Sequence, residues 1–341
     1  SLSNGGLTNV FVQVVAAGVT NVYAGTGGGG VYRSTNNGGS WATFNNGLTN
    51  LNISALIVKD SNVFAGTVGG GIFRSTNNGL NWTALSTGLT DMNIRTFTFR
   101  DSNLYSGTEG GVFHSTDNGN NWTPVNTNLL NLDIRSLAIN DSNLFAGTYG
   151  DGVFKKRNTD SIWTAVNTDL TGKNIFSLRT NGTNIFAGSD SGVFLTKNNG
   201  ANWINRNQGF APKSPVAALL TTSSFIYAGV ISQSVWRRDL TDIIGIQFIE
   251  GNVPVNYLLH QNYPNPFNPS TRIRYEIPQT GFVTVRIFDM LGKEVETLVN
   301  ENLNAGTYEA TFNASNYSSG VYFYSLQTQN FTETKRMVVV K

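Results

Sequence analysis

The stretch that decides the fold is Asn62-Val-Phe-Ala-Gly-Thr-Val-Gly-Gly-Gly-Ile-Phe-Arg-Ser-Thr-Asn-Asn-Gly-Leu-Asn-Trp82, because the chain repeats it at a nearly constant interval. Tryptophans mark this interval at steps of 41, 40, 41 and 40 residues: Trp41, Trp82, Trp122, Trp163 and Trp203. A constant period of this length is the signature of a repeat architecture.

An upstream motif recurs with the tryptophans in six copies: Tyr23-Ala-Gly-Thr, Phe64-Ala-Gly-Thr, Tyr105-Ser-Gly-Thr, Phe145-Ala-Gly-Thr, Phe186-Ala-Gly-Ser and Tyr227-Ala-Gly-Val. The second unit reads as four short strands, at residues 53–58, 63–67, 72–75 and 82–85. Four short antiparallel strands per period match one blade of a β-propeller. We therefore predict an all-β fold in which residues 1–240 form a six-bladed β-propeller of four-stranded blades.

The two ends of the repeat region predict how the propeller closes. Residues 1–8 align with the end of a unit, residues 44–49, so the chain enters in the middle of a blade. We expect these residues to supply the outer strand that the sixth blade lacks, because a closed ring leaves no unpaired edge.

Composition excludes several classes of protein. Charged residues make up only 13% of the 341 residues and the net charge is +2, which argues against nucleic acid as a partner. The absence of cysteine removes disulfides and thiolate chemistry, and two histidines exclude a His-rich metal site. The longest apolar run, residues 10–19, is shorter than the roughly 20 residues of a spanning helix. No membrane span, metal or cofactor is predicted.

A second signature lies between the last two strands of a unit. Its four clearest copies are Ser34-Thr-Asn-Asn-Gly-Gly-Ser-Trp41, Ser75-Thr-Asn-Asn-Gly-Leu-Asn-Trp82, Ser115-Thr-Asp-Asn-Gly-Asn-Asn-Trp122 and Thr196-Lys-Asn-Asn-Gly-Ala-Asn-Trp203. They resemble the Asp-box (S-x-D-x-G-x-x-W) of sialidase-like propellers, with Asn in place of Asp except at Asp117. An Asn or Asp in a tight turn bonds its own backbone, and Trp fills the space between sheets. We interpret these boxes as structural braces.

Propeller ligands usually bind where the innermost strands converge. The equivalent positions there are Gln13, Ser54, Arg95, Arg135, Phe176 and Ala217. Four of these are candidate ligand or partner contacts: Gln13, Arg95, Arg135 and Phe176. Two arginines beside an aromatic ring suit a carboxylate, phosphate or sugar, although exposed strand ends also carry Arg for solubility. A second aligned set on the third strand reads as a solvated basic stripe: Arg33, Arg74, His114, Lys155, Leu195 and Arg237.

Catalytic constellations are missing from the propeller. Glycosidases need two opposed carboxylates, whereas the acidic residues here lie mostly in Asp-Ser-Asn turns such as residues 60–62. With His114 and His260 as the only histidines, a His-based triad is disfavoured. We predict that the protein is not an enzyme. Carboxylates from different blades could still meet, so a glycan-cleaving hydrolase remains an alternative.

The C-terminal part has a different organisation. Residues 241–256 lose the period and read as a linker. The next blocks include Gln261-Asn-Tyr-Pro-Asn-Pro-Phe-Asn-Pro-Ser-Thr271 and about seven alternating strands, which predict a small β-sandwich over residues 257–341.

This segment resembles the type A C-terminal sorting domain of the bacterial type IX secretion system, and every block matches in order. The matching positions are Pro264, Asn265, Pro266, Asp289, Gly292, Gly320 and the last strand from Lys335 to Lys341. The resemblance implies export by the type IX secretion machinery to the outer-membrane surface or the extracellular space. In that family the domain is commonly removed after export.

These patterns together predict a secreted or cell-surface, non-enzymatic binding or adhesion propeller whose ligand is a glycan or a protein. An alternative is a structural subunit of an extracellular fibre or surface layer, in which a retained C-terminal domain mediates self-association.

Overall fold

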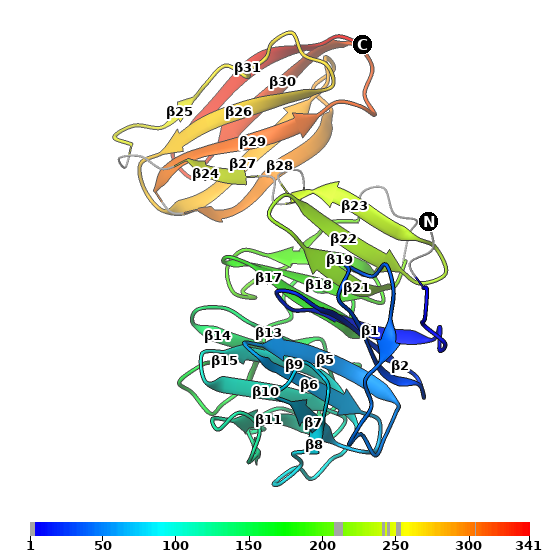
Figure 1. The fold of residues 1–341 in the computed structure, drawn as a ribbon. Helices are drawn as coiled ribbons and strands as arrows, with labels where there is room; N and C mark the ends of the chain where they lie inside the picture. Colours follow the sequence, from blue (N-terminus) through cyan, green and yellow to red (C-terminus); the bar gives the residue numbers. More distant parts are fainter. Residues whose placement is uncertain (1–3, 208–213, 241–242, 244–245, 250–253, 304) are drawn as a thin grey trace. The chain divides into compact units, whose positions relative to one another are not determined.

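The computed structural model describes residues 4–207, 214–240, 243, 246–249, 254–303 and 305–341 (Figure 1). All of its named strands pair in an antiparallel manner, in eight sheets. The chain divides into two compact units. The first comprises Ser1–Thr221 with Ile226–Arg237, and the second comprises Thr222–Phe225 with Arg238–Lys341. The prediction of an all-β fold is confirmed.

The first unit contains six sheets, which we number blades 1 to 6 in chain order. Blade 1 consists of β1 (Val12–Ala17), β2 (Val22–Thr26), β3 (Gly30–Ser34) and β4 (Ala42–Thr43). Blade 2 consists of β5 (Ile53–Lys59), β6 (Asn62–Thr67), β7 (Ile72–Ser75) and β8 (Thr83–Ala84). Blade 3 consists of β9 (Ile94–Arg100), β10 (Asn103–Thr108), β11 (Gly111–Ser115) and β12 (Thr123–Pro124). Blade 4 consists of β13 (Ile134–Ile139), β14 (Asn143–Thr148), β15 (Val153–Arg157) and β16 (Thr164–Ala165). Blade 5 consists of β17 (Ile175–Asn181), β18 (Asn184–Ser189), β19 (Gly192–Thr196) and β20 (Ile204–Asn205). Blade 6 consists of β21 (Val216–Thr221), β22 (Phe225–Val230) and β23 (Val235–Asp239).

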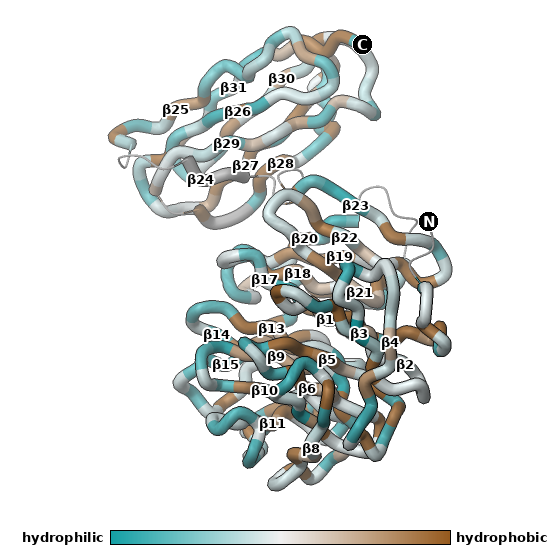
Figure 2. Tube along the Cα trace, viewed as in Figure 1, coloured by the Kyte–Doolittle hydropathy of each residue, from teal (hydrophilic) through white to brown (hydrophobic). Residues whose placement is uncertain are grey.

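The first strand of each blade is its inner strand, and inner strands of consecutive blades pack side by side from β1 to β21. Figure 2 shows the apolar stretches, in brown, along inner strands such as β5 and β9. The glycine of each Ala-Gly-Thr motif permits this approach. A Cβ atom on Gly66 would lie 2.3 Å from the side chain of Ile94 in the next blade, so only glycine fits.

The boxes brace each blade against the preceding one. In blade 2, Ser75 Oγ accepts a hydrogen bond from the N–H of Gly79 at 2.8 Å and donates to Asn77 Oδ1 at 2.9 Å. This turn directs Trp82 into the interface, where its indole N–H donates to the carbonyl of Phe44 in blade 1 at 2.8 Å. The same bond to the preceding blade recurs at Trp122, Trp163 and Trp203. These bonds are consistent with the role of structural braces that we expected for the boxes.

Three basic residues of the third strand, Arg33, Arg74 and Lys155, bond the following blade, so for these three the interpretation as a solvated stripe is wrong. Arg33 donates to the carbonyl of Asn78 at 2.7 Å, and Arg74 donates to that of Asn118 at 2.7 Å. Each carbonyl belongs to the box of the following blade. The sequence hid this role because the acceptors are backbone atoms, which carry no residue-type signal.

The N-terminal segment lies against blade 1. The carbonyl of Gly5 accepts a hydrogen bond from the N–H of Trp41 at 2.8 Å, and the hydroxyls of Thr8 and Tyr32 are 2.8 Å apart. The outer strand expected for blade 6 would begin at residues 1–3, which lie outside the described residues. In the part of the chain that the structure describes, blade 6 has three strands. Within that part, β21 and β1 also do not pack together as the other inner strands do.

The second unit contains two four-stranded sheets. The strands of the first, in spatial order, are β24 (Ile246–Ile249), β29 (Gly306–Asn313), β26 (Ser270–Ile277) and β25 (Leu258–Leu259). Those of the second are β28 (Glu294–Leu303), β27 (Gly281–Phe288), β30 (Gly320–Gln327) and β31 (Thr332–Val339). Residues from both sheets form one buried apolar cluster, which includes Tyr275, Phe312, Val285 and Tyr324.

One stretch predicted as linker is structured. Residues 246–249 form β24, whose backbone pairs with β29 from Ile246 opposite Ala310 to Ile249 opposite Thr307. Loss of the 41-residue period suggested a linker over residues 241–256. The loss reflects a change of fold unit instead, since Ile-Gln-Phe-Ile is itself a strand pattern.

Replacement of a box tryptophan tests the brace. In Trp122→Phe the carbonyl of Leu85 loses its donor inside an interface where Trp122 is 2% exposed. We expect a loss of about 1–3 kcal/mol in the free energy of unfolding, measured by urea denaturation. Trp41→Phe is the matched control, because Trp41 is only half-buried. An equal loss in both variants would contradict the brace.

The single acidic box predicts a pH-dependent difference. Hydrogen bonds from the side chain and backbone N–H of Asn121, and then from Ser115, lower the pKa of Asp117 to about 2. A lowered folded-state pKa stabilises the fold above the ordinary carboxyl pKa, and this stabilisation disappears as the pH falls through 2. Asp117→Asn should therefore melt below the parent at pH 6, and the gap should close between about pH 4 and 2. A gap that does not change with pH would refute this assignment.

Candidate functional site

The six equivalent entrance positions occupy the same place in the structure, the second residue of each inner strand. We call this set, from Gln13 to Ala217, the entrance ring. Hydrogen bonds link two of its members to the next blade. Gln13 Nε2 donates to Asn52 Oδ1 of blade 2 at 2.8 Å, and Ser54 Oγ donates to the carbonyl of Ile94 in blade 3 at 2.5 Å. These polar contacts join blades 1 to 3 at the entrance.

Both arginines of the entrance ring already have acidic partners. Arg95 pairs with Glu109, which lies just after β10 of the same blade. Arg135 Nη2 lies 2.6 Å from Asp133 Oδ2. Because each guanidinium is neutralised within its own blade, the prediction that the two arginines suit a free carboxylate or phosphate loses its electrostatic basis.

Some hydrogen-bonding capacity remains at the ring. Arg95 Nε, Arg135 Nε and Asp133 Oδ1 are buried and have no partner among the described residues. Unpartnered buried polar atoms are costly, and they indicate a place where water or a ligand completes the bonding. Two donors and one acceptor therefore remain without a described partner in blades 3 and 4.

Aromatic rings lie next to these atoms. Tyr149 is 50% exposed, and the guanidinium carbon of Arg135 lies 5.1 Å from its ring centroid. The rings of Tyr149 and Phe176 are 6.5 Å apart and belong to blades 4 and 5. An exposed ring beside paired donors and acceptors suits a neutral, polar ligand with a flat face, such as a sugar, better than an anion.

The partners Glu109, Asp133 and Tyr149 were not predicted. A signal for two of them was present in the sequence. The position after the Ala-Gly-Thr motif varies strongly between units: Gly27, Val68, Glu109, Tyr149 and Asp190. Aligning that position, as well as the inner strands, would have brought Glu109 and Tyr149 to the ring.

A cavity lies further along the inner strands, and most of the side chains that line it are aliphatic or aromatic. The last residues of β1, β5, β9, β13 and β17 line this cavity of about 480 Å³. Among the described residues that line it, Arg179 is the only charged one, and its guanidinium donates to the carbonyl of Leu178 at 2.8 Å. Desolvation by the channel wall lowers the pKa of Arg179, although water still reaches a good part of the side chain.

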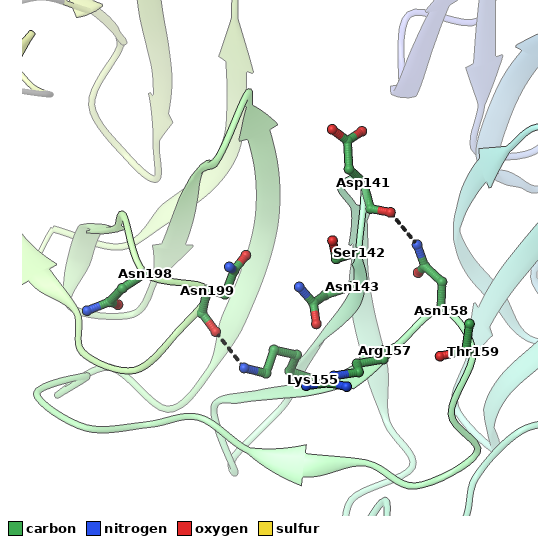
Figure 3. Close-up of a pocket in the computed structure, with 9 residues that line it drawn as sticks. All are labelled: Asp141, Ser142, Asn143, Lys155, Arg157, Asn158, Thr159, Asn198 and Asn199. Carbon is green, nitrogen blue, oxygen red and sulfur yellow. Dashed lines mark hydrogen bonds between the residues drawn. The ribbon is translucent and has the colours of Figure 1, made fainter. Parts of the chain in front are cut away.

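A second recess, of about 640 Å³, lies on the rim between blades 4 and 5 (Figure 3). Its residues come from the turn at residues 141–143 of blade 4, from residues 155 and 157–159 at the divergent box of that blade (residues 156–163), and from the box of blade 5. Lys155 donates to the carbonyl of Asn199 at 3.0 Å. Blade 4 has Lys156 where the other boxes have Ser or Thr. Its ammonium donates to the carbonyl of Asp160 at 2.9 Å, so it replaces the hydroxyl as the centre of the turn. Burial lowers the pKa of Lys156.

Across the described ranges, no group of three or more His, Cys, Asp or Glu side chains is arranged to hold a metal ion. None of the helices in the same ranges is long and apolar enough to cross a membrane.

In the second unit the predicted motif residues meet at the last strand. Asn265 Oδ1 accepts a hydrogen bond from the N–H of Val338 at 2.9 Å. The N–H of Phe267 donates to the carbonyl of Val338, and the carbonyl of Phe267 accepts from the N–H of Val340, each at 3.0 Å. Pro264 accepts from Thr271 Oγ1 at 2.7 Å. The segment around residues 264–267 is therefore attached along the edge of β31.

The remaining motif positions lie in turns and at strand ends. Asp289 Oδ1 accepts from the N–H groups of Leu291 and Lys293 at 2.9 and 3.0 Å, and Gly292 takes a positive φ of 77° in that turn. Gly320 begins β30 and pairs with Val339. Lys335 pairs with Glu333 at 3.1 Å, and Lys341 donates to the carbonyl of Ser315 at 2.8 Å.

A buried hub was missed by the sequence analysis. Tyr324 donates from its hydroxyl to the carbonyl of His260 at 2.9 Å and accepts from the N–H of Asn262 at 2.8 Å. Asn262 is 2% exposed and also donates to Thr271. Burial raises the pKa of Tyr324 to about 12, so the hydroxyl remains a donor at all ordinary pH values. Asn262 stands inside the quoted motif, but nothing in its residue type indicates that it is buried.

Comparisons with known proteins divide the chain in the same way. Residues 72–184 match a family described as the DUF6242 beta propeller domain. Residues 261–340 match the secretion system C-terminal sorting domain. This type IX sorting domain indicates export to the cell surface or the extracellular space and interaction with the secretion machinery. No curated protein matches the chain in sequence.

Similar solved structures share the fold at low identity. PorZ, an essential surface component of the type-IX secretion system of Porphyromonas gingivalis, aligns with a TM-score of 0.57 and 13% identity over 97% of this chain and 52% of PorZ. YCF48 bound to a D1 peptide gives 0.56 and 10%, over 90% and 93% of the two chains. An ancestral GH74 enzyme gives 0.56 and 16%, over 97% and 62%. The chain spans about half the length of PorZ.

Tyr324→Phe tests the buried hub. The change leaves the N–H of Asn262 and the carbonyl of His260 without their partner, and we expect the second unit to lose about 1–3 kcal/mol of stability. Tyr322→Phe is the matched control, since the Tyr322 hydroxyl bonds a single carbonyl, that of Ser318. Unfolding of both variants should be followed by amide hydrogen exchange in β26 and β30. Equal protection in the two variants would contradict the hub.

Proposed function

We propose that the protein is a non-enzymatic binding module, exported through its C-terminal sorting domain, whose entrance ring binds a glycan. The observation that carries the proposal is the half-exposed ring of Tyr149, flanked by Phe176 and by unpartnered donor and acceptor atoms of Arg135 and Asp133. Aromatic faces stack on sugar rings, and planar charged side chains hydrogen-bond sugar hydroxyls.

One feature supports binding over hydrolysis. The acidic side chains next to the two arginines of the entrance ring, Glu109 and Asp133, are each engaged by one of those arginines. A carboxylate oxygen that is bonded to an arginine is already occupied, whereas a general acid or base has to reach the substrate. The proposal that the protein is not an enzyme rests on this pairing.

The finer features of the fold belong to the same proposal. We interpret the boxes as Asp-box turns, and the paired sheets of the second unit as the sorting-type β-sandwich. A peptide ligand is the alternative for the entrance, because a structure with the same fold, YCF48, binds a D1 peptide.

Glycan-array screening of the purified chain, followed by calorimetry with the best ligand, tests the entrance ring. We expect Tyr149→Ala to weaken binding at least tenfold, since it removes the stacking surface. Arg100→Ala is the control, because Arg100 also forms an ion pair, with Asp141 at 2.9 Å, but lies at the other end of β9. Retention of full affinity by Tyr149→Ala, or no glycan binding by the parent, would refute the proposal.

A further inference from the structure

Blade 6 exposes an apolar position that every other blade buries. The first apolar residue of the third strand is at most 2% exposed in blades 1 to 5: Val31, Ile72, Val112, Val153 and Val193. Its equivalent in blade 6, Val235, is 70% exposed. Val235 lies on the face that each blade turns towards its successor, since its equivalent in blade 1, Val31, is buried in one cluster with Ile53 and Leu56 of blade 2.

Blade 1 shows the complementary exposure. The fourth residue of the inner strand is at most 8% exposed in blades 2 to 6: Leu56, Phe97, Leu137, Leu178 and Leu219. Its equivalent in blade 1, Val15, is 60% exposed. The first residue of the inner strand is fully buried in the same five blades, whereas Val12 is 38% exposed. These residues lie on the face that each blade turns towards its predecessor.

The two exposed faces are the two halves of one recurring interface. Between blades 1 and 2, for example, Tyr23 and Val31 of the first blade are buried against Ile53 and Leu56 of the second. Blade 6 presents the first half and blade 1 the second. In the described part of the chain, β21 and β1 do not pack against each other as the other neighbouring inner strands do.

We propose that the faces of blades 1 and 6 are the seat of one further blade, a four-stranded antiparallel sheet of this same repeat type from another stretch of polypeptide. One such sheet covers both faces at once with an interface that the molecule already uses five times. A second copy of the chain would cover only one face per contact. Direct closure of blade 6 on blade 1 would bring β21 against β1.

The N-terminal segment supports this occupant. The Trp41 N–H bonds the carbonyl of Gly5, just as the Trp82 N–H bonds that of Asn46, in the final turn of blade 1. Residues 5–8 therefore occupy the place that the final turn of a preceding blade fills elsewhere. A further blade between blades 6 and 1 would use residues 5–8 as its own last turn.

Addition of a repeat tests the proposal. A copy of residues 42–82 is joined directly before Ser1, so that its final Trp precedes Ser1 as Trp41 precedes Ala42. We expect the extended chain to be monomeric and its melting temperature to rise by about 4 °C or more. Amide hydrogen exchange in β1 and β23 should slow at least tenfold relative to the unextended chain.

Two variants make the result specific. Val15→Asp and Val235→Asp should change the melting temperature of the unextended chain little, because both side chains are largely exposed there. In the extended chain each should abolish most of the gain. No gain from the added repeat would overturn the proposal. Two further results would also overturn it, because they would show that a second copy of the chain, or direct closure of blade 6 on blade 1, covers the two faces. One is an oligomer of the unextended chain, in light scattering, that Val15→Asp dissociates. The other is strong protection of β1 and β23 before extension.

Discussion

The structure of the first unit depends on the contact between consecutive blades. A blade of four short strands cannot bury both of its faces alone, so its stability comes from its neighbours. The contact has two components. A motif glycine such as Gly66 lets the inner strand of the next blade approach, and an indole N–H such as that of Trp82 bonds a carbonyl of the preceding blade. The box turn positions that indole, and Arg33 and Arg74 of the third strand donate hydrogen bonds to backbone carbonyls of the box in the following blade.

This dependence explains which parts of the fold could be predicted. The 41-residue period, the strand pattern and the bracing role of Trp82 are carried by residue types, so the sequence predicts them. The bond from Arg33 to the carbonyl of Asn78 is not predictable in the same way, because a backbone acceptor has no identity in the sequence. Strand β24 was missed for another reason. A four-residue strand without the repeat period is indistinguishable from a linker until its partner, β29, is known.

The entrance ring illustrates the same limit. Aligning the repeats places Gln13, Arg95, Arg135 and Phe176 at equivalent positions, and the structure keeps that register. The charge state of the surface was not predictable, because Glu109 and Asp133 reach the arginines from loops outside the aligned strand. Their pairing changes the chemistry of the ring from an anion site to a polar surface beside Tyr149. The motif residues of the second unit were found from a resemblance, whereas the Tyr324 hub became visible only with its partners.

The most direct measurement of the central claim, that each blade is held by the indole of the next, is exchange of the tryptophan indole protons with solvent by NMR. The account predicts slow exchange at Trp82, Trp122, Trp163 and Trp203, with Trp236 exchanging faster because its side chain is more exposed. Exchange of those four indoles as fast as that of Trp236 would contradict it.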